Sequence, residues 1–174
     1  MVSDKLIGEI TFANEGETSH FAKQLAPLLT VGDVLALEGD LGAGKTAFSR
    51  ALINSLPSLS GGIEREEVPS PTFTLVQIYD RAATQIWHFD LYRLENPEEA
   101  YELGIEEAFS DGISLIEWPD KLGFLMPHGR LRVKLGYGIE ETSRTLALFG
   151  NENWKQKLRP LFAASKAGSS VDGS

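Results

Sequence analysis

Residues 39–46 read GDLGAGKT, and this glycine-rich segment constrains the fold more than any other part of the chain. It follows VLALE (34–38), a short apolar run typical of a buried strand, and a helical pattern runs from about Lys45 to Leu56, before Pro57. Glycine tolerates backbone angles that turn main-chain N–H groups toward an anion, and the first turn of a helix offers further N–H groups. The pattern therefore predicts a strand, a phosphate-binding loop and a helix, the opening unit of an α/β fold.

This segment is a complete match to the Walker A pattern, whose diagnostic positions are held by Gly39, Gly44, Lys45 and Thr46. The lysine of such a loop reaches the β and γ phosphates of a nucleotide, and the neighbouring hydroxyl ligates Mg²⁺. From average residue frequencies, about 1 in 100 chains of this length would match the pattern by chance. A glycine-rich turn that binds no phosphate is therefore a poor alternative interpretation. The sequence predicts that the chain binds a nucleoside triphosphate.

The other segments alternate between strand and helix patterns. Strands are expected at 6–12, 34–39, the second half of 70–80, 86–91 and 113–118, and as a hairpin at 131–137 and 144–149. Helices are expected after the capping residue Asn14, after Asn96 with its following proline and acids, and at 151–158. Interleaved strands and helices predict an α/β protein with a sheet that is at least partly parallel.

Composition narrows the class of protein. The 174 residues are 42% hydrophobic and include no cysteine, which fits a domain with an ordinary core and excludes disulfides and thiolate metal sites. We expect a single domain over residues 1–160 and a disordered tail over 161–174. No apolar run approaches the roughly 20 residues of a membrane span and no secretion signal is recognisable, so a cytoplasmic protein without membrane contact is expected. The net charge of −9 opposes direct binding of nucleic acid, so work on RNA would require a partner.

Two acids are candidates for completing the magnesium site. Asp90 ends the strand pattern IWHFD, and Glu117 ends ISLIE. Both are expected at the carboxyl edge of the sheet, where ligands bind in open α/β folds. One would hold Mg²⁺ directly or through water and the other would orient water; these patterns do not rank them. The plain alternative is a solvated acid at each strand end.

Residues close to these acids are weaker candidates. Ser70, Pro71 and Thr72 form a hydroxyl-rich loop of the kind that senses a γ phosphate, although an ordinary turn has the same composition. His88 fits either a phosphate sensor or a strand histidine with satisfied hydrogen bonds. Trp118 fits either core packing or a partner contact.

Two sequence motifs that are missing favour one kind of nucleotide and one class of reaction. No Asn-Lys-x-Asp motif for guanine is present, which favours ATP. No arginine-rich lid is present, which favours hydrolysis coupled to a conformational change over transfer to a small acceptor. A P-loop small-molecule kinase remains the first alternative, and a nucleotide-binding adaptor that never hydrolyses ATP is the second.

Five motifs together resemble the TsaE (YjeE) family of bacterial P-loop ATPases. They are GDLGAGKT (39–46), SPTFTLV (70–76), HFDLYRL (88–94), NPEEAYELGI (96–105) and IEWPD (116–120), in the family's order and spacing. The resemblance covers about residues 6–150. It implies a small three-layer P-loop NTPase-like fold with a mixed sheet and a weak Mg²⁺-dependent ATPase. It also implies a role with the TsaB and TsaD proteins in threonylcarbamoylation of adenosine 37 of tRNA, which the chain would contact only through that complex.

The resemblance also implies roles for individual residues. Those at the nucleotide are Glu15, Gly42, Ala43, Gly44, Lys45, Thr46 and Ala47. Thr46 and Glu117 would ligate Mg²⁺, which ranks Glu117 as the protein ligand and Asp90 as the acid that positions water. Lys45, Thr72 and Trp118 would complete the catalytic set with Asp90.

Overall fold

The computed structural model describes residues 4–62 and 66–162. Its strands are β1 (Lys5–Phe12), β2 (Val34–Glu38), β3 (Val76–Asp80), β4 (Gln85–Asp90), β5 (Gly112–Glu117), β6 (Leu131–Tyr137) and β7 (Arg144–Gly150). Its α-helices are α1 (Glu15–Leu25), α2 (Lys45–Ile53), α3 (Ile105–Asp111) and α4 (Glu152–Lys157). Short 3₁₀ helices are η1 (Ala26–Leu28), η2 (Pro97–Tyr101) and η3 (Pro119–Leu125). Each strand predicted from the sequence is present, and the hairpin of β6 and β7 is confirmed.

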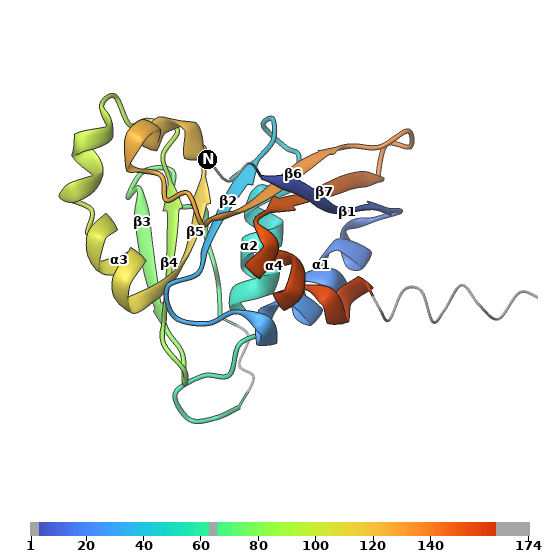
Figure 1. Cartoon of the computed structure of the whole chain (residues 1–174), viewed down its shortest axis with the longest axis horizontal. Helices are drawn as coiled ribbons and strands as arrows, with labels where there is room; N and C mark the ends of the chain where they lie inside the picture. Colours follow the sequence, from blue (N-terminus) through green and yellow to red (C-terminus); the bar gives the residue numbers. More distant parts are fainter. Residues whose placement is uncertain (1–3, 63–65, 163–174) are drawn as a thin grey trace, which may run out of the picture.

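All described strands belong to one seven-stranded sheet with the order β1-β7-β6-β2-β5-β4-β3 (Figure 1). The centre is parallel, because β2 pairs with both β5 and β6 and β4 pairs with β5 in that sense. The outer pairs are antiparallel. This topology places the carboxyl ends of β2, β4 and β5 at one edge, so the loops that follow these strands meet there.

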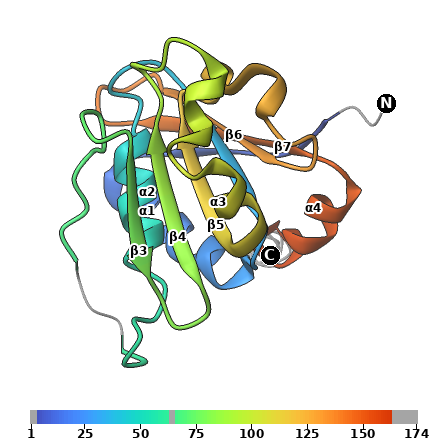
Figure 2. The same cartoon turned by 90° about the vertical axis from the view of Figure 1, so that its left-hand side faces the viewer.

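Helices cover both faces of the sheet, with α1 and α2 on one face and α3 on the other (Figures 1 and 2). Alternation along β2 divides its side chains between two cores. Leu35 and Leu37 face the core shared with α1 and α2, whereas Val34 faces the core shared with α3. The predicted three-layer P-loop NTPase-like fold with a mixed sheet is confirmed.

Local sequence signals set the start of two helices, and the one at Asn14 was expected. The side chain of Asn14 accepts a hydrogen bond from the Glu17 N–H at 3.1 Å, and the Glu17 carboxylate accepts one from the Ala13 N–H at 2.7 Å. Asn151 caps α4 by accepting from the Trp154 N–H. These contacts confirm that short polar residues before an apolar run mark helix starts.

A helix begins after Asn96 as predicted, but it is a short 3₁₀ helix. Residues Pro97–Tyr101 form the 3₁₀ helix η2, the Asn96 side chain makes no capping hydrogen bond, and α3 begins only at Ile105. Gly104 interrupts the pattern with a φ of +86°, and a Cβ there would lie 2.9 Å from the Trp87 ring. Gly104, with its left-handed backbone close to Trp87, therefore separates η2 from α3.

The carboxyl-terminal predictions are tested in part. Leu161 and Phe162, assigned above to the tail, are helical and pack against the core on the α1 side. The rest of the predicted tail, 163–174, lies outside the described residues. The single domain over 1–160 stays a prediction. Among residues 4–62 and 66–162, no helix is long and apolar enough to cross a membrane.

Candidate nucleotide-binding site

Glycine residues shape the loop between β2 and α2. Gly39, Gly42 and Gly44 have φ values of +148°, +81° and +108°, a region that favours glycine because it lacks a Cβ. Gly44 directly precedes α2, which begins at Lys45. The loop therefore brings main-chain N–H groups and a helix amino terminus to one place, as phosphate binding requires.

Substitution of Gly39 by alanine tests how tightly this loop is held. A Cβ at Gly39 would lie 2.5 Å from the main-chain oxygen of Leu135, so the loop must move away from β6. We expect Gly39→Ala to lower the free energy of unfolding by about 1–3 kcal/mol and to weaken nucleotide binding. Urea denaturation and ATP titration measure both quantities. Gly62→Ala is the control, since a Cβ there meets no atom within 4 Å, and equal effects at both positions would contradict the expectation.

Lys45 points into the loop and lies against an aromatic ring. Its side chain is 5% exposed, its Nζ donates to the Gly39 oxygen at 2.5 Å, and Nζ is 3.5 Å from the centroid of the Trp118 ring. Burial lowers the pKa of Lys45 below its ordinary value, although the carboxylates of Glu117 and Asp90 oppose this shift. The ammonium group is thus held by a carbonyl and a π face, both of which an incoming phosphate can replace.

Trp118 adopts a strained backbone conformation at the carboxyl end of β5. Its φ is +60°, a value that residues with a Cβ adopt at a cost, and the residue that follows is Pro119. The ring of Tyr92 lies 5.1 Å from the Trp118 ring, centroid to centroid. Strain of this kind persists where the surroundings hold it, and here the indole lies against Lys45.

The two strand-end acids lie side by side but contact different loops. Asp90 and Glu117 are direct partners in the β4–β5 register, and both are buried. The Glu117 carboxylate accepts a hydrogen bond from Thr46 Oγ1, at 3.0 Å to Oε1 and 3.2 Å to Oε2. Asp90 Oδ2 instead accepts from Thr72 Oγ1 at 2.9 Å. Glu117 therefore faces the phosphate-binding loop, and Asp90 faces the loop before β3.

The loop before β3 is tied to the end of β4. Ser70 Oγ lies 3.4 Å from Asp90 Oδ2, and the Asp90 N–H donates to the Leu75 oxygen at 3.0 Å. Leu75 has a φ of +67° and its N–H donates to the Pro71 oxygen. A change at the Asp90 carboxylate would therefore reach this loop directly.

Thr46 and Glu117 are a suitable donor set for Mg²⁺. A hydroxyl and a carboxylate oxygen lie 3.0 Å apart beside the loop, and both are the hard oxygen ligands that Mg²⁺ prefers. The described part of the chain holds no group of three or more His, Cys, Asp or Glu side chains suited to a metal. In nucleotide sites Mg²⁺ is typically bound by one or two side chains and by the phosphates, so the protein need supply no more than the Thr46 and Glu117 oxygens.

A cavity of about 840 Å³ opens over the loop and the start of α2. It contains every residue that the resemblance assigned to the nucleotide: Glu15, Gly42, Ala43, Gly44, Lys45, Thr46 and Ala47. Its other lining residues are Asn14, Thr18, Leu41, Glu141, Thr142 and Arg144. The volume and the lining fit a nucleotide with its phosphates on the loop.

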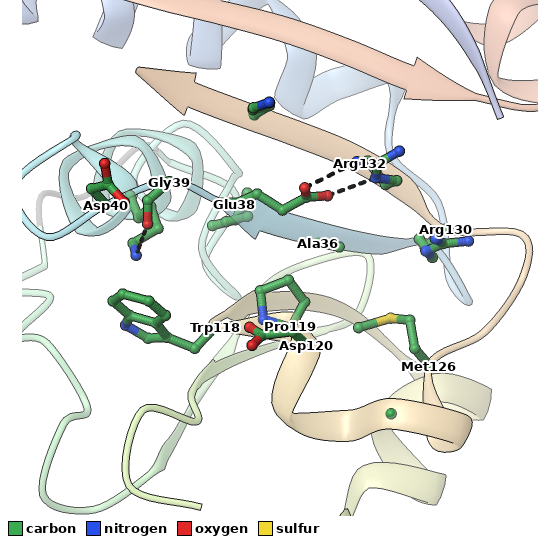
Figure 3. Close-up of a pocket in the computed structure, with 14 residues that line it drawn as sticks. Ala36, Glu38, Gly39, Asp40, Trp118, Pro119, Asp120, Met126, Arg130 and Arg132 are labelled. Carbon is green, nitrogen blue, oxygen red and sulfur yellow. Dashed lines mark hydrogen bonds and ion pairs between the residues drawn. The ribbon is translucent and has the colours of Figure 1, made fainter. Parts of the chain in front are cut away.

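A second cavity of about 600 Å³ lies beyond Lys45, between β2, β6 and η3. Lys45 lines both cavities. Figure 3 shows the ion pair of Glu38 and Arg132 on one side of this second cavity and Trp118 and Met126 on the other. Arg132 Nε lies 2.7 Å from Glu38 Oε2, so its charge is already paired.

Residues 12–146 match the family model described as "Threonylcarbamoyl adenosine biosynthesis protein TsaE". The chain belongs to the TsaE family.

Individual relatives of this TsaE chain agree with that assignment. The tRNA threonylcarbamoyladenosine biosynthesis protein TsaE of Rickettsia felis is 41% identical over 140 residues, which are 80% of this chain and 78% of the relative. The Bacillus subtilis protein of the same name is 39% identical over 140 residues, 79% of this chain and 84% of the relative. The crystal structure of Bacillus subtilis YdiB superposes with a TM-score of 0.72 and 29% identity, covering 95% of this chain and 98% of that one. The resemblance found in the sequence is confirmed.

Sequence reasoning missed the part of the TsaE cavity formed by the β6–β7 hairpin. Thr142 Oγ1 donates to the Ala13 oxygen at 2.9 Å, and the Tyr137 hydroxyl donates to the Leu41 oxygen at 2.6 Å. These bonds hold the hairpin tip, with Arg144, beside the start of α1 and the phosphate-binding loop. The hairpin itself was predictable, but nothing in its sequence indicates the surface that it faces.

Proposed function

We propose that this chain is a Mg²⁺-dependent ATPase that serves tRNA threonylcarbamoyladenosine synthesis as an accessory factor. The main support for the proposal is that one cavity is lined by the glycine-rich loop, Lys45 and Thr46. The Thr46 hydroxyl also donates a hydrogen bond to Glu117. A site with these groups suits a triphosphate and its metal.

Roles for the binding residues follow from their positions. Main-chain N–H groups from Gly42 to Ala47 would bind the phosphates, and Lys45 would leave the Gly39 oxygen and the Trp118 ring to neutralise the β and γ phosphates. Glu15 lines the end of the cavity beside α1, which suits the base end of the nucleotide. Thr46 and Glu117 would hold Mg²⁺, which when bound supplies positive charge to the phosphate oxygens.

Contacts of the proposed catalytic residues support the roles that we assign to them. Asp90 would orient the attacking water, because its carboxylate is buried at the same sheet edge. Thr72 would report the state of the site to the loop before β3 through its bond to Asp90. Trp118 would hold Lys45 in place between turnovers. The Arg93 guanidinium lies over the Phe73 ring, 4.4 Å from its centroid, and we assign it no role in hydrolysis.

The biological role rests on family membership and on charge. Relatives bear the name tRNA threonylcarbamoyladenosine biosynthesis protein, and the net charge of −9 disfavours direct contact with tRNA. We therefore propose that the chain acts in the cytoplasm with TsaB and TsaD. Its ATP cycle would reset that complex, while the partners modify the tRNA.

Hydrolysis of γ-³²P-labelled ATP tests the proposal against both alternatives. The expected result is Mg²⁺-dependent release of inorganic phosphate, faster when TsaB and TsaD are present. A small-molecule kinase would place the label on a metabolite from a cell extract instead. A nucleotide-binding adaptor would return the ATP unchanged even with both partners, and either result would overturn the proposal.

A further inference from the structure

A buried histidine contacts the carboxylate that faces the phosphate-binding loop. His88 is 0% exposed, and its Nε2 lies 2.6 Å from Glu117 Oε2. In the β4–β5 register His88 is opposite Leu115, two residues before Glu117, so the two side chains are diagonal neighbours on the α2 face of the sheet. The contact therefore depends on the sheet itself and not on a loop.

Hydrogen-bond accounting assigns the direction of this contact. An ionised carboxylate only accepts, so Nε2 must carry the proton and donate to Glu117. Nδ1 of His88 has no hydrogen-bond partner among residues 4–62 and 66–162. With the proton on Nε2, the unpartnered Nδ1 is only an acceptor. In the opposite tautomer Nδ1 would be a buried N–H without an acceptor, and Nε2 would direct its lone pair at the carboxylate.

The histidine restricts how Glu117 is oriented. Oε2 accepts from His88 at 2.6 Å, while Thr46 Oγ1 is closer to Oε1, at 3.0 Å, than to Oε2, at 3.2 Å. Glu117 is itself only 3% exposed, so water offers it few other donors. Without His88 the carboxylate would be oriented by Thr46 alone among these two donors and would lose a hydrogen bond in a buried place.

We propose that His88 is a positioning residue that orients the Glu117 carboxylate for Mg²⁺. This inference rests on the proposed function, because it concerns the metal of the same ATP site. Groups that hold a metal-binding side chain in orientation typically contribute about 10- to 100-fold to metal affinity or activity. His88 would act through Glu117 and not touch the nucleotide.

Nucleotide titrations of His88 variants separate this role from simple core packing. A fluorescent ATP analogue is titrated in EDTA, and Mg²⁺ is then titrated at fixed nucleotide. We expect His88→Leu to raise the half-saturating Mg²⁺ concentration about tenfold and to leave affinity in EDTA unchanged. His88→Gln, whose amide N–H reaches the position of Nε2, should restore the wild-type Mg²⁺ requirement. In a Glu117→Gln background, His88→Leu should add nothing, since the group that it orients has been altered.

Different outcomes overturn different statements. A wild-type Mg²⁺ requirement in His88→Leu, or equal weakening of its affinity in EDTA, overturns the positioning role alone. Absence of any Mg²⁺-dependent nucleotide affinity in the wild-type chain overturns the proposed function as well. If His88→Leu does not fold, His88→Asn takes its place, because the asparagine side chain is too short to reach Glu117. Equal Mg²⁺ requirements for the His88→Asn and His88→Gln variants would then overturn the inference.

Discussion

Replacement of Lys45 by alanine is expected to lower the rate of ATP hydrolysis by about 10²- to 10³-fold, the usual effect of removing one preorganised group that stabilises the transition state. Lys45 is the cation at the meeting point of both cavities, and its Nζ is held within the loop by the Gly39 oxygen. No other side chain on the loop between β2 and α2 carries positive charge. Release of phosphate measured at saturating ATP, alone and with TsaB and TsaD, gives the rate.

A matched control separates this effect from a change in net charge. Lys155 is an exposed residue of α4 and does not line either cavity. Lys155→Ala removes the same charge as Lys45→Ala and should keep the wild-type rate of hydrolysis. Thermal unfolding of both variants checks that the fold is retained. Undiminished hydrolysis in Lys45→Ala would remove the basis of the proposed ATPase.

Neutralising the two strand-end acids is expected to have different consequences. Glu117→Gln should raise the Mg²⁺ concentration required for half-maximal hydrolysis by on the order of 100-fold, the upper end of effects seen around metal sites. The reason is that Glu117 accepts the hydrogen bond from Thr46, which lies at the place proposed for the metal and the phosphates. Asp90→Asn should mainly lower the maximal rate, because Asp90 is bonded to Thr72 and lies one strand further from the loop.

Magnesium titrations of hydrolysis by the two variants decide between these roles. Glu102→Gln, an exposed acid at the end of η2, is the control and should match the wild type in both quantities. If Asp90→Asn showed the larger rise in Mg²⁺ requirement, the roles of Asp90 and Glu117 would be exchanged. If neither variant changed it, Mg²⁺ would not be held at this edge of the sheet.

Local signals account for the parts of the molecule that the sequence predicted well. The loop from Gly39 to Thr46 depends on backbone freedom and on a helix start, and both are properties of adjacent residues. Strand ends are also local, so Asp90 and Glu117 were both recognised as acids at the carboxyl edge of a sheet. The helix start after Asn96 was also local and was recognised, although its 3₁₀ form and the separate start of α3 after Gly104 were not predicted.

The family was predictable from the order of the motifs, since five separate segments agree in spacing with TsaE proteins, and the family model confirmed it. His88 illustrates what the motif alone left open. Within HFDLYRL it fitted a phosphate sensor or an ordinary strand histidine, and the strand register showed its contact with Glu117.

By itself, then, the sequence determined the phosphate-binding loop, the order of strands and helices along the chain, and the two acids that end β4 and β5. The tertiary structure alone decided that Glu117 faces Thr46 while Asp90 faces Thr72, that Trp118 lies on Lys45, and that the β6–β7 hairpin lines the cavity over the glycine-rich loop. The physical reason is the distance along the chain between the residues that interact. Backbone conformation responds to neighbouring residues, whereas the pairing of side chains from different strands depends on register and on packing across the sheet.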